Sequence, residues 1–405
     1  MKRLALAVLL LAPAAGAVEW TPLYGVTALA GQHSFRGKTA SFSGLLDAVL
    51  APAARVDDRW AVLPSWRSTY EGTRSLDESL GAATVAQERM THRLAARAVY
   101  QKPGSRWLLK PSASLKYELL KETSDERWGR GLFDRRVLTL GGEVEYLLVD
   151  PASVRLAADV FDARYPNYTS LESQAAAAFK GDSLARELAG DRVLDRRGWQ
   201  LRAAGTAPLG PRAALDLSLG AVRSGFARQR VVVETGLLSG DARSDLLTTV
   251  AATARMPHEL NLDLRALGAV ELSVAALRSN QNGYDASRGR FLSQFYDFTE
   301  YRLAPSLKLL IGPPRRPATL SLGVGLKKRS YPHRPPQSGD GSYEGGTLKQ
   351  TEWSLDVAGT YPVAPRFSLM FSLSRASASS NTRFERFYRY SYEAMNALAG
   401  FRWEY

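Results

Sequence analysis

The chain has 405 residues, of which 45% are hydrophobic and 23% charged, and its formal net charge is +13. This composition is typical of a folded protein, and no apolar run reaches the roughly 18 residues of a membrane helix, which excludes a bundle of such helices. The sequence contains no Cys and four His, so disulfide frameworks, thiol catalysis and thiolate metal sites are excluded. We predict no cofactor and no metal.

The N-terminus has the pattern of an export signal. Met1-Lys2-Arg3 is a short basic head, Leu4 to Ala14 is an apolar core, and Ala15-Gly16-Ala17 offers the small residues that a signal peptidase accepts. We predict cleavage after Ala17, which leaves residues 18–405 as one exported domain. A buried helix is the alternative, but Pro13 argues against it.

The remaining sequence alternates apolar and polar residues, which indicates strands with two different faces. The clearest run is Leu260 to Ala276, where the even positions are apolar or small, and shorter runs begin at Leu138, Trp353 and Phe367. Strands of soluble sandwiches average about 5 to 6 residues, and several of these runs are about twice as long. Strands of about 10 residues with one apolar face suit a barrel that crosses a membrane.

The connections between these runs alternate in length. The seven short links, most of which contain Pro, lie near 51–57, 102–105, 150–153, 208–211, 257–259, 312–317 and 362–365. The eight longer polar segments lie near 32–40, 71–86, 121–131, 164–195, 225–242, 279–290, 330–346 and 378–385. These connections predict an all-β fold, a single transmembrane antiparallel barrel of about 16 strands (range 14–18), with short periplasmic turns and long extracellular loops.

One segment is an exception to this pattern. Residues 173–194 contain the run Ala175 to Ala178 and place Leu184 and Leu188 four residues apart, which predicts a short helix in the longest loop. Such a helix could fold into the lumen and narrow it, or it could lie outside on the rim.

The alternation also assigns side chains to the two faces. Aromatic residues near strand ends predict girdles at the membrane interfaces, and we assign to these girdles Trp60, Trp66, Trp107, Trp199, Trp353, Tyr361, Trp403 and Tyr405. The opposite parity predicts pore-lining charges at Arg67, Arg93, Arg97, Lys110, Arg155, Arg202, Arg265, Arg302, Glu143, Glu145, Asp263, Glu352 and Asp356. Both signs occur, which fits either a wet channel with opposed charged walls or an interior of paired ions.

No established catalytic motif appears, so we predict no enzyme and no catalytic residue. A phosphate-binding Gly-rich loop, a zinc-binding His-Glu-x-x-His helix and a dinucleotide-binding Gly motif are all absent. Pairing Trp60 with Tyr100 would place Ser68 opposite His92 near the outer leaflet, which leaves a barrel-wall lipid hydrolase as a remote alternative. The basic residues are dispersed along the chain, which argues against nucleic acid as a partner.

The C-terminus resembles a known class. Phe401-Arg402-Trp403-Glu404-Tyr405 ends on an aromatic residue with aromatics at alternate positions, and this is similar to the signal that delivers barrels to the insertion machinery of the bacterial outer membrane. The tail from Ser380 through Tyr392 is faintly similar to the barrels of surface-lipoprotein assembly modifiers. Those proteins usually have a helical-repeat domain in front of the barrel, for which we expect no room here, so no function is carried over from them.

The resemblance to porin-like outer-membrane barrels implies passive diffusion of small hydrophilic solutes. The alternative is a non-conducting scaffold or export component that binds a partner through its loops. The expected partners are outer-membrane lipid, lipopolysaccharide and the barrel-insertion machinery, with an envelope protein or a second copy of the chain also possible.

Overall fold

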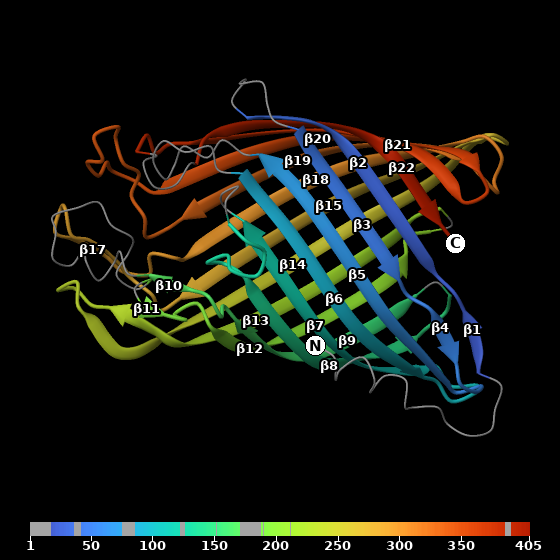
Figure 1. Cartoon of the computed structure of the whole chain (residues 1–405), viewed down its shortest axis with the longest axis horizontal. Coiled ribbons are helices and arrows are strands. Elements are labelled where there is room, and N and C mark those ends of the chain that lie inside the picture. Colours follow the sequence, from blue (N-terminus) through green and yellow to red (C-terminus); the bar gives the residue numbers. More distant parts are fainter. Residues whose placement is uncertain are drawn as a thin grey trace.

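A computed structural model describes residues 18–35, 42–74, 86–121, 126–150, 152–170, 188, 190–210, 212–384 and 390–405. It confirms a closed antiparallel barrel of 16 wall strands (Figure 1). The wall strands are β2 (Tyr24–Phe35), β3 (Phe42–Leu50), β5 (Trp60–Arg74), β6 (Ala86–Tyr100), β7 (Trp107–Lys121), β8 (Arg135–Leu147), β9 (Ser153–Arg164), β12 (Arg196–Pro208), β13 (Ala214–Val232), β14 (Leu238–Asn261), β15 (Leu264–Ser279), β18 (Phe298–Ile311), β19 (Ala318–Tyr331), β20 (Leu348–Ala364), β21 (Phe367–Ser380) and β22 (Tyr392–Glu404).

Each wall strand pairs with the next along the chain, and β22 pairs with β2 to close the barrel. Two short strands, β1 (Glu19–Thr21) and β4 (Ala53–Arg55), pair with each other, and β4 also pairs with β5, beyond the ends of β2 and β3. Two small hairpins lie outside the wall, β10 (Thr169–Ser170) with β11 (Gly190–Asp191), and β16 (Gly283–Asp285) with β17 (Arg290–Leu292). The C-terminus lies at the end opposite β10, β11 and β17 (Figure 1).

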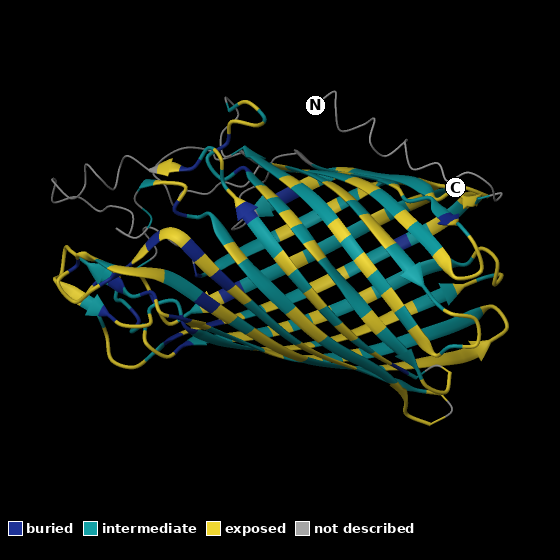
Figure 2. Ribbon diagram, turned by 90° about the horizontal axis from the view of Figure 1, so that it is seen from below, coloured by how far each residue is buried: buried dark blue, intermediate teal, exposed yellow. Residues whose placement is uncertain are grey.

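Alternating side chains explain why these sequences form a barrel. Exposed and less exposed residues follow one another along each strand and give the wall a checkered pattern (Figure 2). A membrane-spanning strand needs about 9 to 11 residues, whereas β13 has 19 residues and β14 has 24. These two strands therefore extend past the membrane as a hairpin, where the sequence predicted a loop over 225–242.

The structure divides the longest alternating run. The segment predicted as one strand, Leu260 to Ala276, contains the turn at Leu262 and Asp263 between β14 and β15. A bulge between Glu259 and Asn261, followed by the two-residue turn, keeps the apolar side chains at even positions on both strands. Periodicity alone could not locate this turn. Pro257, expected in a turn, lies within β14 opposite Leu267.

The predicted loop helix is not confirmed. Most of 173–194 lies outside the described residues, and its described end forms β11 and a turn. The described part of the chain contains no α-helix. Within it, no helix is long and apolar enough to cross a membrane. The predicted signal peptide, residues 1–17, lies outside the described residues.

Candidate functional site: the charged lumen and its extracellular mouth

The wall strands have one apolar face and one charged face. On β8 and β9, for example, Leu140 and Val160 are opposite each other and exposed, and Glu145 and Arg155 are opposite each other on the other face. Charged side chains in contact with lipid are costly, so the apolar face is the outer face and the charged face lines the lumen. We call these the outer face and the lumen face.

Many lumen-face charges form ion pairs between neighbouring strands. Lys110 Nζ on β7 lies 2.8 Å from a carboxylate oxygen of Glu143 and 2.5 Å from one of Glu145, both on β8. Arg67 on β5 binds both carboxylate oxygens of Asp47 on β3, at 2.9 and 2.6 Å. Such bidentate pairs fix the guanidinium plane, so these side chains form an ordered lining.

The strand register shows where the predicted lining residues lie. Asp263 is in the turn between β14 and β15 and so is not part of the wall, because the strand predicted across it ends at Asn261. The other predicted positions all lie on wall strands and share the lumen face by register. Among them, Arg202 pairs with Asp159 at 3.4 Å, and Arg302 pairs with Glu271 at 3.0 Å.

Three basic lumen-face residues stand side by side. The register places Arg67 opposite Arg93, and Arg93 opposite Lys116, on the adjacent strands β5, β6 and β7. Neighbouring strands lie about 4.8 Å apart, so this basic row concentrates three positive charges within about 10 Å. Arg67 binds Asp47 and Lys116 lies 2.6 Å from Glu118, whereas Arg93 makes no ion pair with a described residue. The sequence identified Arg67 and Arg93, and the pairing of Trp60 with Tyr100 implies that they are opposite each other. The position of Lys116 beside Arg93 depends on the register of β6 with β7, which the sequence did not show.

An aromatic cluster lies at the extracellular ends of β18, β19 and β20, on the lumen face. Its buried members are Tyr331, Leu348 and Tyr390, with Phe298 packed against them. The guanidinium of Arg334 lies 4.0 Å from the ring centroid of Phe295, 4.8 Å from that of Tyr331 and 5.7 Å from that of Tyr390. These cation–π contacts fix the loop segments at the mouth of the barrel. The sequence does contain a signal for this cluster, because four of the eight residues in 291–298 are aromatic, which is unusual for a solvated loop.

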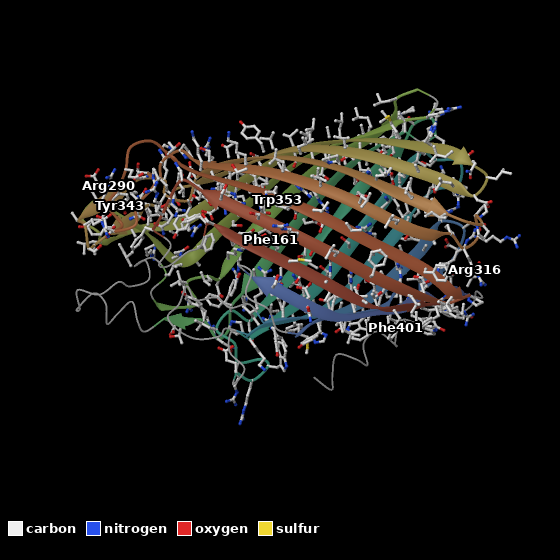
Figure 3. The ribbon with its side chains drawn as sticks, turned by 90° about the horizontal axis from the view of Figure 1, so that it is seen from above. Phe161, Arg290, Arg316, Tyr343, Trp353 and Phe401 are labelled. Atoms are coloured by element: carbon white, nitrogen blue, oxygen red, sulfur yellow. The ribbon has the colours of Figure 1, made fainter. Side chains whose placement is uncertain are left out.

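Two extracellular loops, 280–297 and 332–347, are attached to each other. Arg288 donates to the carbonyl oxygen of Asp340 at 2.7 Å, and the Tyr343 hydroxyl donates to the Asp285 carboxylate at 3.0 Å. Arg290 lies 4.4 Å from the Tyr343 ring centroid, and both are at the end of the barrel opposite Arg316 (Figure 3). Burial raises the pKa of Asp285, but hydrogen bonds from Ser287 and Tyr343 outweigh it, and the net pKa is lowered.

Replacing Asp285 with Asn should loosen this loop contact. The carboxylate accepts bonds from the Ser287 hydroxyl at 2.6 Å and from the Tyr343 hydroxyl, so its loss should weaken the loop by about 1 to 3 kcal/mol. Limited proteolysis of the folded barrel should then cut 280–297 faster, and Asp241→Asn in the β13–β14 hairpin is the control.

The same contact has a defined pH dependence. Folding lowers the pKa of Asp285, so the hydrogen bonds to its carboxylate stabilise the loop fully above the ordinary aspartate pKa of about 3.9. This stabilisation is lost as the pH falls through the pKa of Asp285 in the folded protein. Cleavage of the wild type should therefore be as slow at pH 5 as at pH 8. Faster cutting at pH 5 would contradict this assignment.

Aromatic residues of the outer face form contacts at the short-turn end of the barrel. Trp60 and Tyr100 lie 4.8 Å apart between ring centroids, and Trp107 and Tyr146 lie 4.6 Å apart. Tyr405 stacks on Tyr24, also at 4.8 Å. The predicted girdle residues Trp199, Trp353, Tyr361 and Trp403 also lie on the outer face by register. Trp66 lies further along β5, on the outer face opposite Leu50, the last residue of β3, which is itself opposite Tyr24.

The outer face also contains the predicted Ser–His pair. Trp60 pairs with Tyr100, and in the same register Ser68 is opposite His92, with its hydroxyl oxygen 3.0 Å from His92 Nδ1. The nearest outer-face neighbours of His92 are Met90, Leu94 and Tyr117, none of which is a carboxylate or amide. A serine nucleophile needs a base that is itself oriented by a third group. No such group adjoins this pair among the described residues.

We expect this pair to be catalytically silent. Refolded wild-type protein should neither hydrolyse phospholipid vesicles nor react with a fluorophosphonate probe, since nothing orients His92 as a base. Mass spectrometry of the probe-treated protein provides the measurement, with Ser68→Ala as the control. Probe labelling at Ser68 that disappears in Ser68→Ala would instead support the hydrolase alternative.

The closed barrel, its apolar outer face and its charged lumen face define a porin-like bacterial outer-membrane β-barrel. No family model and no curated protein matches the sequence. Among solved structures, the chain is similar to OccD3 (OpdP) of Pseudomonas aeruginosa, with TM-score 0.47 and 12% identity over 97% of this chain and 93% of that one.

Two further structures are similar in fold. One is a bacterial polysaccharide outer membrane secretin, with TM-score 0.45 and 10% identity over 95% of this chain and 98% of that one. The other is OmpT of Vibrio cholerae in its trimer form, with TM-score 0.43 and 10% identity over 96% of this chain and 100% of that one. At these identities the likeness concerns the fold alone. Within the described residues, no group of three or more metal-binding side chains occurs.

Proposed function

We propose that the protein is a channel for passive diffusion of small hydrophilic solutes, with a preference for anions. The observation that carries this proposal is the basic row, Arg67, Arg93 and Lys116, on the lumen face of three adjacent strands. Barrels of 16 strands are wide enough to enclose water, and rings of fixed cations attract anions into such a path. The proposed pore-lining residues are the predicted set without Asp263.

A recess in the lumen wall that is lined by acidic, basic and hydroxyl side chains is an argument for a hydrophilic solute. It has a volume of about 330 Å³ and is lined by Glu300, Arg302, Lys327, Glu352 and Ser354, among others. Lys327 lies 2.9 Å from Glu352, which also accepts a hydrogen bond from Tyr392 at 2.7 Å. Such paired groups offer hydrogen bonds to hydroxyl and carboxylate groups without a strong net charge.

The experiment that tests the channel is conductance of refolded residues 18–405 in a planar bilayer. We expect steady ion-passing openings, and with a KCl gradient we expect a reversal potential whose sign indicates anion preference. A folded barrel that inserts and passes no current would overturn the channel and favour the non-conducting scaffold. The paired lumen charges and the attached extracellular loops are the observations that favour that second candidate.

The route to the membrane belongs to the same proposal. Residues 1–17 would act as the cleaved signal peptide, and the aromatic C-terminal strand β22 would be read by the barrel-insertion machinery. Comparing the N-terminal residue of the protein purified from outer membranes with Val18 tests the cleavage site.

A further inference from the structure

Four arginines gather on one part of the outer face. Arg136, Arg164 and Arg197 lie at the extracellular ends of the consecutive strands β8, β9 and β12, Arg223 lies beside them midway along the longer β13, and all four are exposed. The register places Arg136 opposite Arg164, and Arg223 opposite Trp199. Tryptophan on an outer face marks the membrane interface, so these arginines lie at the depth of lipid headgroups.

The arginine cluster is only partly neutralised. Asp162 accepts hydrogen bonds from Arg164 Nε at 2.8 Å and from Arg197 Nε at 3.2 Å. Arg136 and Arg223 form no ion pair with a described residue. Asp195 also acts electrostatically on Arg164. Two carboxylates beside four guanidinium groups still leave an excess of positive charge, which would be screened in open solvent and is stronger beside a low-dielectric membrane.

An apolar groove lies directly below the cluster on the same four strands. Its volume is about 560 Å³, and its outer-face lining is Gly142, Val144, Leu156, Ala158, Leu201, Ala203, Leu219 and Ala221. Gly142 and Ala158 are opposite each other, so the wall is thinnest there, between the larger neighbours Leu140 and Leu156. The groove therefore continues from the headgroup depth toward the middle of the membrane.

We propose that the arginine cluster and the groove together bind one lipopolysaccharide molecule of the outer leaflet. Guanidinium groups bind phosphate through paired hydrogen bonds, and the groove offers apolar contact to acyl chains. Four strands at about 4.8 Å spacing spread the cluster over about 14 Å, which suits a headgroup with two separated phosphates better than a single phosphodiester. The inference rests on the placement of the barrel in the membrane and not on the proposed channel.

The test measures binding of lipid A with two phosphates to the folded, detergent-solubilised barrel by native mass spectrometry. A variant with Arg136→Ala, Arg197→Ala and Arg223→Ala should bind at least about tenfold more weakly, because each lost charge-assisted bond removes a substantial part of the affinity. The matched control removes three outer-face cations elsewhere, Arg278→Ala, Lys328→Ala and Arg375→Ala, and should leave binding unchanged.

The groove is tested separately. A Cβ at Gly142 would have Pro111 Cα at 3.4 Å as its nearest neighbour, an ordinary contact, so Gly142→Leu with Ala158→Leu should fold normally while filling the groove. This variant should also lose lipid A, whereas Ala399→Leu on the outer face of β22 should not. Heat-modifiable electrophoretic mobility verifies that each variant is folded.

Three results would overturn the proposal. Equal binding by the arginine variant and its control would show that the cluster is not the phosphate site. Equal affinity for lipid A and phosphatidylglycerol would assign the surface to any anionic lipid. A change of oligomeric mass in the groove-filled variant, with lipid A binding intact, would assign the groove to a second copy of the chain.

Discussion

Replacing the basic row with three glutamates, Arg67→Glu, Arg93→Glu and Lys116→Glu, should reverse the ion preference of the channel. The three positions are adjacent across β5, β6 and β7 on the lumen face, so the variant exchanges three positive charges for three negative ones within about 10 Å. In a tenfold KCl gradient the reversal potential should change sign, within the limit of about 59 mV on either side of zero. The measurement is the zero-current voltage of single channels.

A matched control separates this effect from general changes of charge. Arg223→Glu, Lys328→Glu and Lys349→Glu make the same change of net charge on the outer face, outside the lumen. This variant should keep the anion preference of the wild type. If the basic-row variant kept it as well, these residues would not lie along the ion path.

The second large effect is expected at Gly198 on β12. An added Cβ at Gly198 would lie 1.8 Å from the carbonyl oxygen of Arg223 and 2.7 Å from Phe161 Cζ. Phe161 is opposite Gly198 on β9, so its ring lies against the glycine backbone on the lumen face. Gly198→Val should therefore cost at least about 3 kcal/mol, through movement of the neighbouring backbone and ring.

Refolding yield and urea unfolding, followed by heat-modifiable mobility, measure this cost. Gly205→Val is the control on the same strand, because its Cβ would have only the carbonyl oxygen of Ser153 nearby, at 3.6 Å. Equal stability of the two variants would mean that the wall between β9, β12 and β13 accommodates side chains more easily than the close approach indicates.

The sequence was sufficient to predict the barrel architecture because a membrane imposes a simple pattern on the sequence of each strand. An apolar outer face and a polar lumen face require alternation over about 10 residues, and that period can be recognised without knowing which strands are neighbours. The rule also placed Ser68 opposite His92, since a single pairing, Trp60 with Tyr100, fixes the whole register of a hairpin.

The features that the sequence did not predict correctly share a physical cause, which is that they depend on contacts between segments and not on a local pattern. The turn between β14 and β15 was predicted near 257–259 but lies at Leu262 and Asp263, because a bulge preserved the alternation across it. The basic row and the arginine cluster each depend on register across three or more strands, which no local pattern contains. The aromatic cluster around Arg334 depends on contacts between loops that are far apart in sequence.

The seam between β2 and β22 joins the two ends of the barrel wall. Gly25 to Phe35 pair with Ala394 to Glu404, so the first wall strand to be synthesised finds one of its partners only in the last. Every other wall pair joins strands that are consecutive in the chain and can form locally. A partly assembled wall therefore has two unpaired strand edges until β22 meets β2, and these edges must be protected from aggregation while the barrel assembles.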